Sequence, residues 1–333
     1  MDRTRAVMRT RPLGASGLAA TPIGLGLAGV GRPAYLGLGR ADDLGDDRSV
    51  EFMQKRTHEL LDAAYGAGVR YIDTARSYGF AERFLSSWLT ERARPPGDPV
   101  VGSKWGYTYV ADWSTSAGVH EVKDHSIGAL RRQFAESRTE LGDRLLLYQV
   151  HSATLETGVL SDDAVLTELA HLEERGIAIG LSVSGPGQPD VIRRSLEIRV
   201  DGEPVFQTVQ ATWNLLERSA GLALAEAHEA GYGVIVKEAL ANGRLTSRGE
   251  LAAGVLGEIA TGHGVNVDAI AIAAVLANES VDVVLSGAVT VAQLSSNLEA
   301  LSVQLSASDI EALAALTEPP TQYWSRRQSS RWS

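Results

Sequence analysis

The sequence predicts an α/β protein that folds as one (β/α)8 barrel of the TIM type. Short apolar runs rich in β-branched residues alternate along the chain with segments of helical character. Eight such runs fall within roughly 250 to 300 residues, which fits a closed barrel better than an open doubly wound sheet. No linker or change in composition divides the chain, so we expect a single domain over residues 1–333. A hairpin at about residues 10–20 is expected before the barrel, and an irregular tail at about residues 319–333 after it.

The eight candidate strands follow one another along the chain. The first four are TPIGLGL from Thr21, VRYIDT from Val69, PVVGSKW from Pro99 and RLLLYQVHS from Arg144. The last four are IAIGLSVS from Ile177, VFQTVQATW from Val205, GVIVKEA from Gly233 and VDVVLSGA from Val281. Several of the helical segments between them end with a glycine where a helix C-cap belongs. This alternation predicts parallel strands joined by helical crossovers.

Composition excludes several classes of function. The chain has no cysteine, which removes disulfides, thiolate catalysis and metal sites with Cys ligands. Its formal net charge is −10, so it offers no basic footprint for nucleic acid or an anionic membrane. The longest apolar stretch, residues 269–277, is far too short to span a bilayer. We expect a cytoplasmic protein whose redox chemistry, if it has any, uses a bound cofactor.

A glycine pattern after the first strand resembles a dinucleotide-binding fingerprint. Gly24, Gly26 and Gly29 satisfy G-x-G-x-x-G. The fingerprint requires these glycines to open a helix, but here the chain continues with Pro33 and further glycines. The segment is better interpreted as a glycine-rich loop between a strand and a helix.

Four polar residues fall at neighbouring strand ends, where a barrel of this class carries its active site. Asp73 ends the second strand and Tyr78 lies in the loop after it, Lys104 ends the third strand, and His151 ends the fourth. Each residue alone has an ordinary structural explanation, such as a cap, rim packing or a solvated side chain. Together they form a chemically coherent set.

The set suits the reduction of a carbonyl group. A tyrosine phenol has a pKa near 10, and a neighbouring ammonium lowers that value. We therefore expect Lys104 to assist Tyr78 as proton donor and Asp73 to hold Lys104. Neutral His151 would donate a hydrogen bond to the developing alkoxide.

These motifs resemble those of the aldo-keto reductase superfamily. The matching segments are RPLGASGLAATPIGLGL, YIDTARSYG, GSKWG, LLLYQVHS, IGLSVS, QATWNLL and LSGAVTVAQLSSNLEAL, in order over about residues 10 to 315. The resemblance implies a barrel that binds NADPH, with NADH as a second option, and transfers hydride between nicotinamide and an aldehyde or ketone. It implies Asp73, Tyr78, Lys104 and His151 as the catalytic residues.

The resemblance also implies a set of cofactor contacts. Ser182 and Gln210 are expected at the carboxamide. The expected contacts along the nicotinamide, pyrophosphate and adenosine are Gly26, Leu27, Lys237, Glu238, Leu240, Asn242, Gly287, Gln293 and Asn297. We expect a small carbonyl substrate, and no partner of nucleic acid or membrane.

Three regions depart from the family pattern. Val183 follows Ser182 where the family usually has Asn, and Gln293 stands where many members place an arginine on the 2′-phosphate. The seventh strand ends in Lys237 and Glu238 where an aromatic residue and a serine are usual. A carboxylate facing pyrophosphate is repulsive unless a cation neutralises it, and we expect Lys237 or Arg244 to do so.

Two other functions stay open beside the leading interpretation, an active NAD(P)-dependent oxidoreductase. The altered seventh strand favours a nucleotide-binding regulatory protein with low turnover. A Schiff-base lyase would use Lys237 or Lys104 as nucleophile. The seven histidines show no paired H-x-H at a strand end, so we expect no metal site. The substrate and the oligomeric state do not follow from the sequence.

Overall fold

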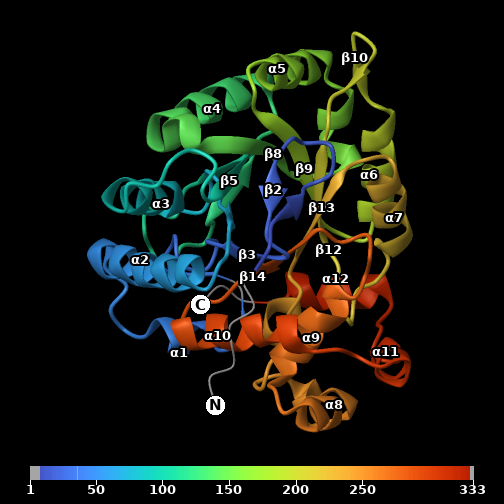
Figure 1. Ribbon diagram of the computed structural model, residues 1–333. Helices are drawn as coiled ribbons and strands as arrows, with labels where there is room; N and C mark the ends of the chain where they lie inside the picture. Colours follow the sequence, from blue (N-terminus) through green and yellow to red (C-terminus); the bar gives the residue numbers. More distant parts are fainter. Residues whose placement is uncertain (1–7, 36, 331–333) are drawn as a thin grey trace.

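Eight parallel strands close into a barrel at the centre of the computed structural model, which describes residues 8–35 and 37–330 (Figure 1). The first four strands around the barrel are β3 (Ile23–Gly26), β4 (Tyr71–Asp73), β5 (Val100–Trp105) and β8 (Leu145–Ala153). The other four are β9 (Ala178–Val183), β12 (Thr208–Thr212), β13 (Gly233–Lys237) and β14 (Val283–Ser286), and β14 pairs with β3. Seven of these eight barrel strands fall within runs expected from the sequence and β8 extends one residue beyond its run, to Ala153, which confirms the predicted (β/α)8 barrel.

Helices surround the barrel on its outside (Figure 1). The layer consists of α2 (Val50–Gly66), α3 (Ala81–Glu91), α4 (Ile127–Leu141), α5 (Asp163–Glu174), α6 (Gln188–Glu197), α7 (Gly221–Glu229), α9 (Val267–Leu276) and α10 (Val291–Leu298). Additional helices are α1 (Arg40–Leu44), α8 (Val255–His263), α11 (Ala307–Ala314) and α12 (Pro320–Gln328). Short 3-10 turns cover 142–144, 155–157, 159–161, 241–243, 250–253 and 299–302.

Side-chain caps fix where several of these helices begin. The hydroxyls of Ser49, Ser126 and Thr290 accept hydrogen bonds from backbone N–H groups in the first turns of α2, α4 and α10. Within the described residues no single helix is long and apolar enough to cross a bilayer. In the same part of the chain, α8 and α9 together are long and apolar enough, but a bend of 91° separates them.

In residues 8–35 and 37–330, three antiparallel hairpins extend the barrel. The pair β1 (Arg11–Pro12) and β2 (Ala19–Ala20) precedes β3, and β10 (Arg199–Val200) pairs with β11 (Glu203–Pro204). Gly14 in the first hairpin has φ 54°, and a Cβ there would lie 2.1 Å from the backbone nitrogen of Gly233. Only glycine permits this close approach. The third hairpin, β6 (Tyr107–Tyr109) with β7 (Glu121–Lys123), follows β5 and was not expected from the sequence.

The segment after Pro319 is not the irregular tail that the sequence suggested. Residues 320–328 form α12, which begins with a proline at its first position. Tyr323 and Trp324 on this helix are buried in a cluster of apolar side chains that includes Leu215, Leu245 and Leu256. Burial of two aromatic side chains stabilises a helix whose sequence is otherwise polar. Residues 331–333 of the predicted tail lie outside the described part of the chain.

Candidate active site

The four expected catalytic residues lie together where β4, β5 and β8 end. The Lys104 ammonium donates hydrogen bonds to both carboxylate oxygens of Asp73, that to Oδ2 at 2.6 Å, and to the Thr74 carbonyl at 2.9 Å. Its Nζ is 3.5 Å from the phenol oxygen of Tyr78. The His151 ring lies edge-on to the Tyr78 ring, with centroids 5.5 Å apart. Parallel strands thus bring residues that are distant in sequence into one cluster.

Burial decides the protonation of this cluster. Burial lowers the pKa of Lys104, and the Asp73 carboxylate acts against this by raising that pKa. Burial also lowers the pKa of His151 well below its usual value, so the imidazole is neutral near pH 7. Ser77 lies beside this ring, with its Oγ 3.4 Å from His151 Nδ1.

The expected lowering of the Tyr78 pKa is not what the structure gives. Burial raises the pKa of Tyr78 well above its usual range, and Tyr35 and Asp73 add to the increase. Asp73 pairs with Lys104 and so offsets the ammonium on which the expectation rested. The phenol is therefore fully protonated near neutral pH, which is the form a proton donor requires.

Gln210 and Ser182 occupy internal positions beside the cluster. The Gln210 side-chain amide donates to both oxygens of Asp73, at 3.1 and 3.0 Å. The Ser182 hydroxyl accepts from the backbone N–H of Ser152 at 2.8 Å. Both residues thus hold the strand ends in position, whatever else they contact.

A cavity of about 480 Å³ opens from Asp73 and Tyr78 across the ends of the strands. Its volume is typical of a small-molecule site. Eight of the expected cofactor contacts line it: Gly26, Gln210, Glu238, Leu240, Asn242, Gly287, Gln293 and Asn297. Three others, Leu27, Ser182 and Lys237, are not among its lining residues.

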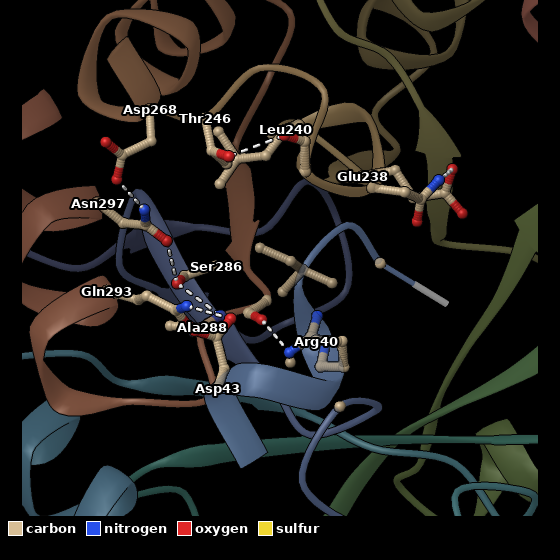
Figure 2. Close-up of a pocket in the computed structure, with 18 of the residues that line it drawn as sticks. Arg40, Asp43, Glu238, Leu240, Thr246, Asp268, Ser286, Ala288, Gln293 and Asn297 are labelled. Carbon is tan, nitrogen blue, oxygen red and sulfur yellow. Dashed lines mark hydrogen bonds between the residues drawn. The ribbon is translucent and has the colours of Figure 1, made fainter. Parts of the chain in front are cut away.

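The far end of the cavity carries charged residues that the sequence analysis missed (Figure 2). Gln293 donates its amide to Asp43 at 2.7 Å, and Arg248 forms an ion pair with the same carboxylate at 2.7 Å. Arg40 donates to the Gly287 carbonyl at 3.3 Å. This end of the cavity thus carries two guanidinium groups, Arg40 and Arg248, beside the carboxylates of Asp43 and Asp268. Arg40 and Asp43 lie in the glycine-rich stretch after the first strand. The charged residues in that stretch were the sign in the sequence that could have pointed to this end of the cavity.

A second polar chain lies along the same wall of the cavity (Figure 2). Asn297 donates to Asp268 at 2.6 Å and accepts from the Ser286 hydroxyl at 2.7 Å. Asp268 accepts a further hydrogen bond from Ser296 at 3.0 Å. These hydrogen bonds fix the orientation of the Asn297 amide. Asn297 comes from α10 and its partner Ser286 from β14.

The two unusual residues of the seventh strand point to different partners. Lys237 donates to the hydroxyls of Ser184 and Thr212, each at 2.9 Å, and burial lowers its pKa to about 8. Its Nζ is 3.9 Å from the Glu238 carboxylate. Lys237 was expected to line the cofactor cavity, but it is not among the residues that line it. The hydroxyls draw the ammonium away from the cavity because they satisfy two of its three donors.

Glu238 is neutralised mainly by a residue of α12. Arg327 donates both Nε and Nη2 to the Glu238 carboxylate, at distances between 2.5 and 3.0 Å. Of the two cations expected to neutralise Glu238, Arg244 is instead paired with Glu318 at 2.5 Å, so that alternative was wrong, whereas Lys237 lies 3.9 Å from the carboxylate and contributes. Burial acts to raise the pKa of Glu238, but Arg327 and Lys237 outweigh it and lower the pKa to about 2. Only the docking of α12 brings Arg327 within reach.

Arg32 is a further buried cation of the site that the sequence did not indicate. Its side chain comes from the loop after β3 and its guanidinium lies 5.0 Å from the centroid of the Tyr78 ring. It donates to the Ser77 carbonyl at 3.1 Å and to Glu121 of β7 at 2.9 Å. The β6–β7 hairpin is therefore tied to the loop that carries Tyr78.

Known proteins resemble this chain over most of its length. A sequence model described as Aldo/keto reductase family matches residues 35–318. The aldo-keto reductase ausK of Emericella nidulans is 26% identical over 333 aligned residues, which cover 90% of this chain and 79% of the relative. Norsolorinic acid reductase stcV of the same organism is 28% identical over 279 residues, 75% of this chain and 69% of the relative. The structure of the aldo-keto reductase AKR11C1 from Bacillus halodurans, in its holo form, matches with a TM-score of 0.70. Identity is 21%, with 93% of this chain and 97% of that chain covered, and the likeness supports the fold.

Proposed function

The chain belongs to the aldo/keto reductase family and is an oxidoreductase of that family, and we propose that it uses NADPH or NADH to reduce an aldehyde or ketone. The observation that carries the proposal is the buried Lys104–Asp73 pair beneath Tyr78, at the end of a cavity large enough for a small-molecule ligand. A protonated phenol beside a neutral imidazole is suited to a carbonyl that becomes an alcohol.

Each residue of the cluster has a separate task in this proposal. Tyr78 donates its proton to the carbonyl oxygen as negative charge develops there. Neutral His151 donates a hydrogen bond to the same oxygen and stabilises the negative charge that develops on it. Lys104, fixed by Asp73, supports the phenolate that Tyr78 becomes after proton transfer. When bound, a nicotinamide supplies the hydride.

The charged end of the cavity supports NADPH as cofactor. NADPH carries a 2′-phosphate that NADH lacks, and guanidinium groups bind phosphate through charge-assisted hydrogen bonds. Gln293 offers no charge, but Arg40 and Arg248 lie at the same end, and burial lowers the pKa of Arg40. A phosphate beside Arg40 would stabilise its charge. We therefore assign the 2′-phosphate to Arg40 and Arg248. Neither residue belongs to α10, the helix that carries Gln293.

Titration with NADPH and NADH in parallel, followed by nicotinamide fluorescence, tests the cofactor assignment. A panel of aldehydes and ketones in the presence of the better cofactor then tests the reaction. Binding of neither nucleotide would contradict the proposal. Binding without oxidation of the cofactor by any carbonyl compound would favour the regulatory alternative.

The regulatory alternative has one specific feature in its favour. Lys237 and the Glu238–Arg327 pair replace the residues that the family usually places at the end of the seventh strand. The lyase alternative is weaker, because Lys104 is an ammonium held by Asp73 and Lys237 does not line the cavity. A nucleophilic lysine must be deprotonated and accessible. Borohydride trapping with a carbonyl compound separates the lyase from the other two.

A further inference from the structure

Arg32 is placed to influence Tyr78 in two ways. The residue is buried, and its guanidinium lies 4.5 Å from the centroid of the Tyr35 ring and 5.0 Å from that of the Tyr78 ring. Both rings line the cavity. Arg32 also donates to the carbonyl of Ser77, the residue before Tyr78. One buried cation thus contacts both the backbone and the ring of the segment that carries the phenol.

The charges around Tyr78 occur as two pairs. The Lys104 ammonium is balanced by Asp73, and the Arg32 guanidinium is balanced by Glu121 of the β6–β7 hairpin at 2.9 Å. Glu121 is more exposed than Arg32, with 22% of its side chain accessible against 2%. Solvent therefore screens Glu121 more strongly than Arg32. The titratable and charged groups that face Tyr78 are Arg32 and Tyr35 from the loop after β3, Asp73 from β4, Lys104 from β5, Glu121 from β7 and His151 from β8.

We propose that Arg32 is a positioning residue that holds the Tyr78 ring and increases the acidity of its phenol, and that Glu121 limits this effect from the β6–β7 hairpin. The inference rests on the proposed function and deepens it, because it makes the strength of the proton donor depend on a hairpin outside the barrel. A cation favours the phenolate, and an anion disfavours it. The directions agree with the pKa of Tyr78, which burial raises and Tyr35 and Asp73 raise further, while Arg32 lowers it and Glu121 raises it.

The test replaces each member of the pair and measures the ionisation of residue 78 directly. A fluorinated tyrosine, intrinsically more acidic than tyrosine, is incorporated at position 78 and titrated by fluorine NMR. Arg32→Gln is expected to raise the pKa of this residue by about 0.5 to 1 unit. That is the range which a unit charge about 5 Å away produces under strong screening. Glu121→Gln is expected to lower it. If Arg32 and Glu121 only support the structure, the pKa of residue 78 should shift in the same direction in both variants or in neither.

The pH profile of reduction gives a second readout. In Arg32→Gln the alkaline limb of kcat/KM should move to higher pH, because the proton donor stays protonated longer. Its plateau should fall by up to about tenfold, because a weaker acid transfers its proton less readily. Glu121→Gln should move the alkaline limb to lower pH. Arg32→Lys, which retains the charge, should restore most of the wild-type profile.

Arg83 provides the matched control, because this exposed arginine of α3 stacks 4.2 Å from the Phe80 ring. Arg83→Gln should leave the ionisation of residue 78 unchanged. Equal shifts in Arg32→Gln and Glu121→Gln, or none in either, would overturn the proposal. If Arg32→Gln does not fold, absence of a downward shift in Glu121→Gln overturns it alone. A protein without reductase activity that still shows opposite shifts would contradict the proposed function but not the electrostatic role of Arg32.

Discussion

Replacement of Glu238 by glutamine should destabilise the protein at neutral pH and leave it unchanged near pH 2. Glu238 and Arg327 have side chains that are 10% and 22% exposed, and they share hydrogen bonds between 2.5 and 3.0 Å. The folded protein lowers the pKa of Glu238 from 4.5 to about 2. Through linkage, that difference corresponds to about 3 kcal/mol of unfolding free energy.

The sign of the pH dependence follows from the direction of the shift. A carboxylate with a lowered pKa in the folded state stabilises the protein above its unfolded pKa, near 4.5, and loses that contribution as pH falls toward 2. The wild type should therefore be about 3 kcal/mol more stable than Glu238→Gln at pH 7, and the two should converge near pH 2.

Urea unfolding of both proteins at several pH values between 7 and 2 measures this difference. Glu226→Gln is the matched control, because Glu226 forms a similar two-point pair with Arg193 in which both side chains are nearly half exposed. Solvent screening makes such a pair contribute little. A difference between wild type and Glu238→Gln that stays constant from pH 7 to pH 2 would refute the reasoning.

Three further results are expected. Tyr78→Phe should reduce kcat by at least about a hundredfold while leaving the NADPH dissociation constant within a few-fold, as measured by turnover and fluorescence titration, and retained turnover would contradict the assignment of Tyr78 as proton donor. Arg40→Gln should weaken NADPH binding by about tenfold or more and flatten its salt dependence while changing NADH binding little; equal effects on both nucleotides would contradict the assigned phosphate site. Trp324→Ala should lower the unfolding free energy by about 3 kcal/mol or more, because it empties a buried aromatic site in the cluster that holds α12. An unchanged urea midpoint would show that α12 contributes nothing to stability.

The sequence alone was sufficient to place the candidate site residues that lie at the ends of barrel strands. Asp73, Lys104 and His151 each follow an apolar β-rich run, so their place at one end of the barrel follows from the strand–helix alternation alone. The pattern carries no information on pairs between loops. Arg32 and Glu121 are 89 positions apart, and so are Glu238 and Arg327.

The end of the seventh strand also shows that the sequence pattern does not identify partners that come from distant segments. The sequence indicates that Glu238 requires a cation, and Lys237 and Arg244 were the two expected partners. The main cation came instead from α12, whose polar sequence gave little sign of a helix. Two buried aromatic residues determine the position of that helix, and their burial is a property of the whole fold.

The distance along the chain between Glu238 and Arg327 has a consequence for synthesis on the ribosome. A chain that grows at about 5 to 20 residues per second reaches Arg327 some 4 to 18 seconds after Glu238, from the 89 positions between them. During this interval the carboxylate lacks the guanidinium that makes its burial favourable, so we expect the loop after β13 to stay open to water. Nascent chains stalled before residue 327 should therefore be cleaved by protease in this loop, and the released 333-residue chain should be protected. Completion of the cavity wall would then be among the last steps of folding, after the barrel strands that the wall covers.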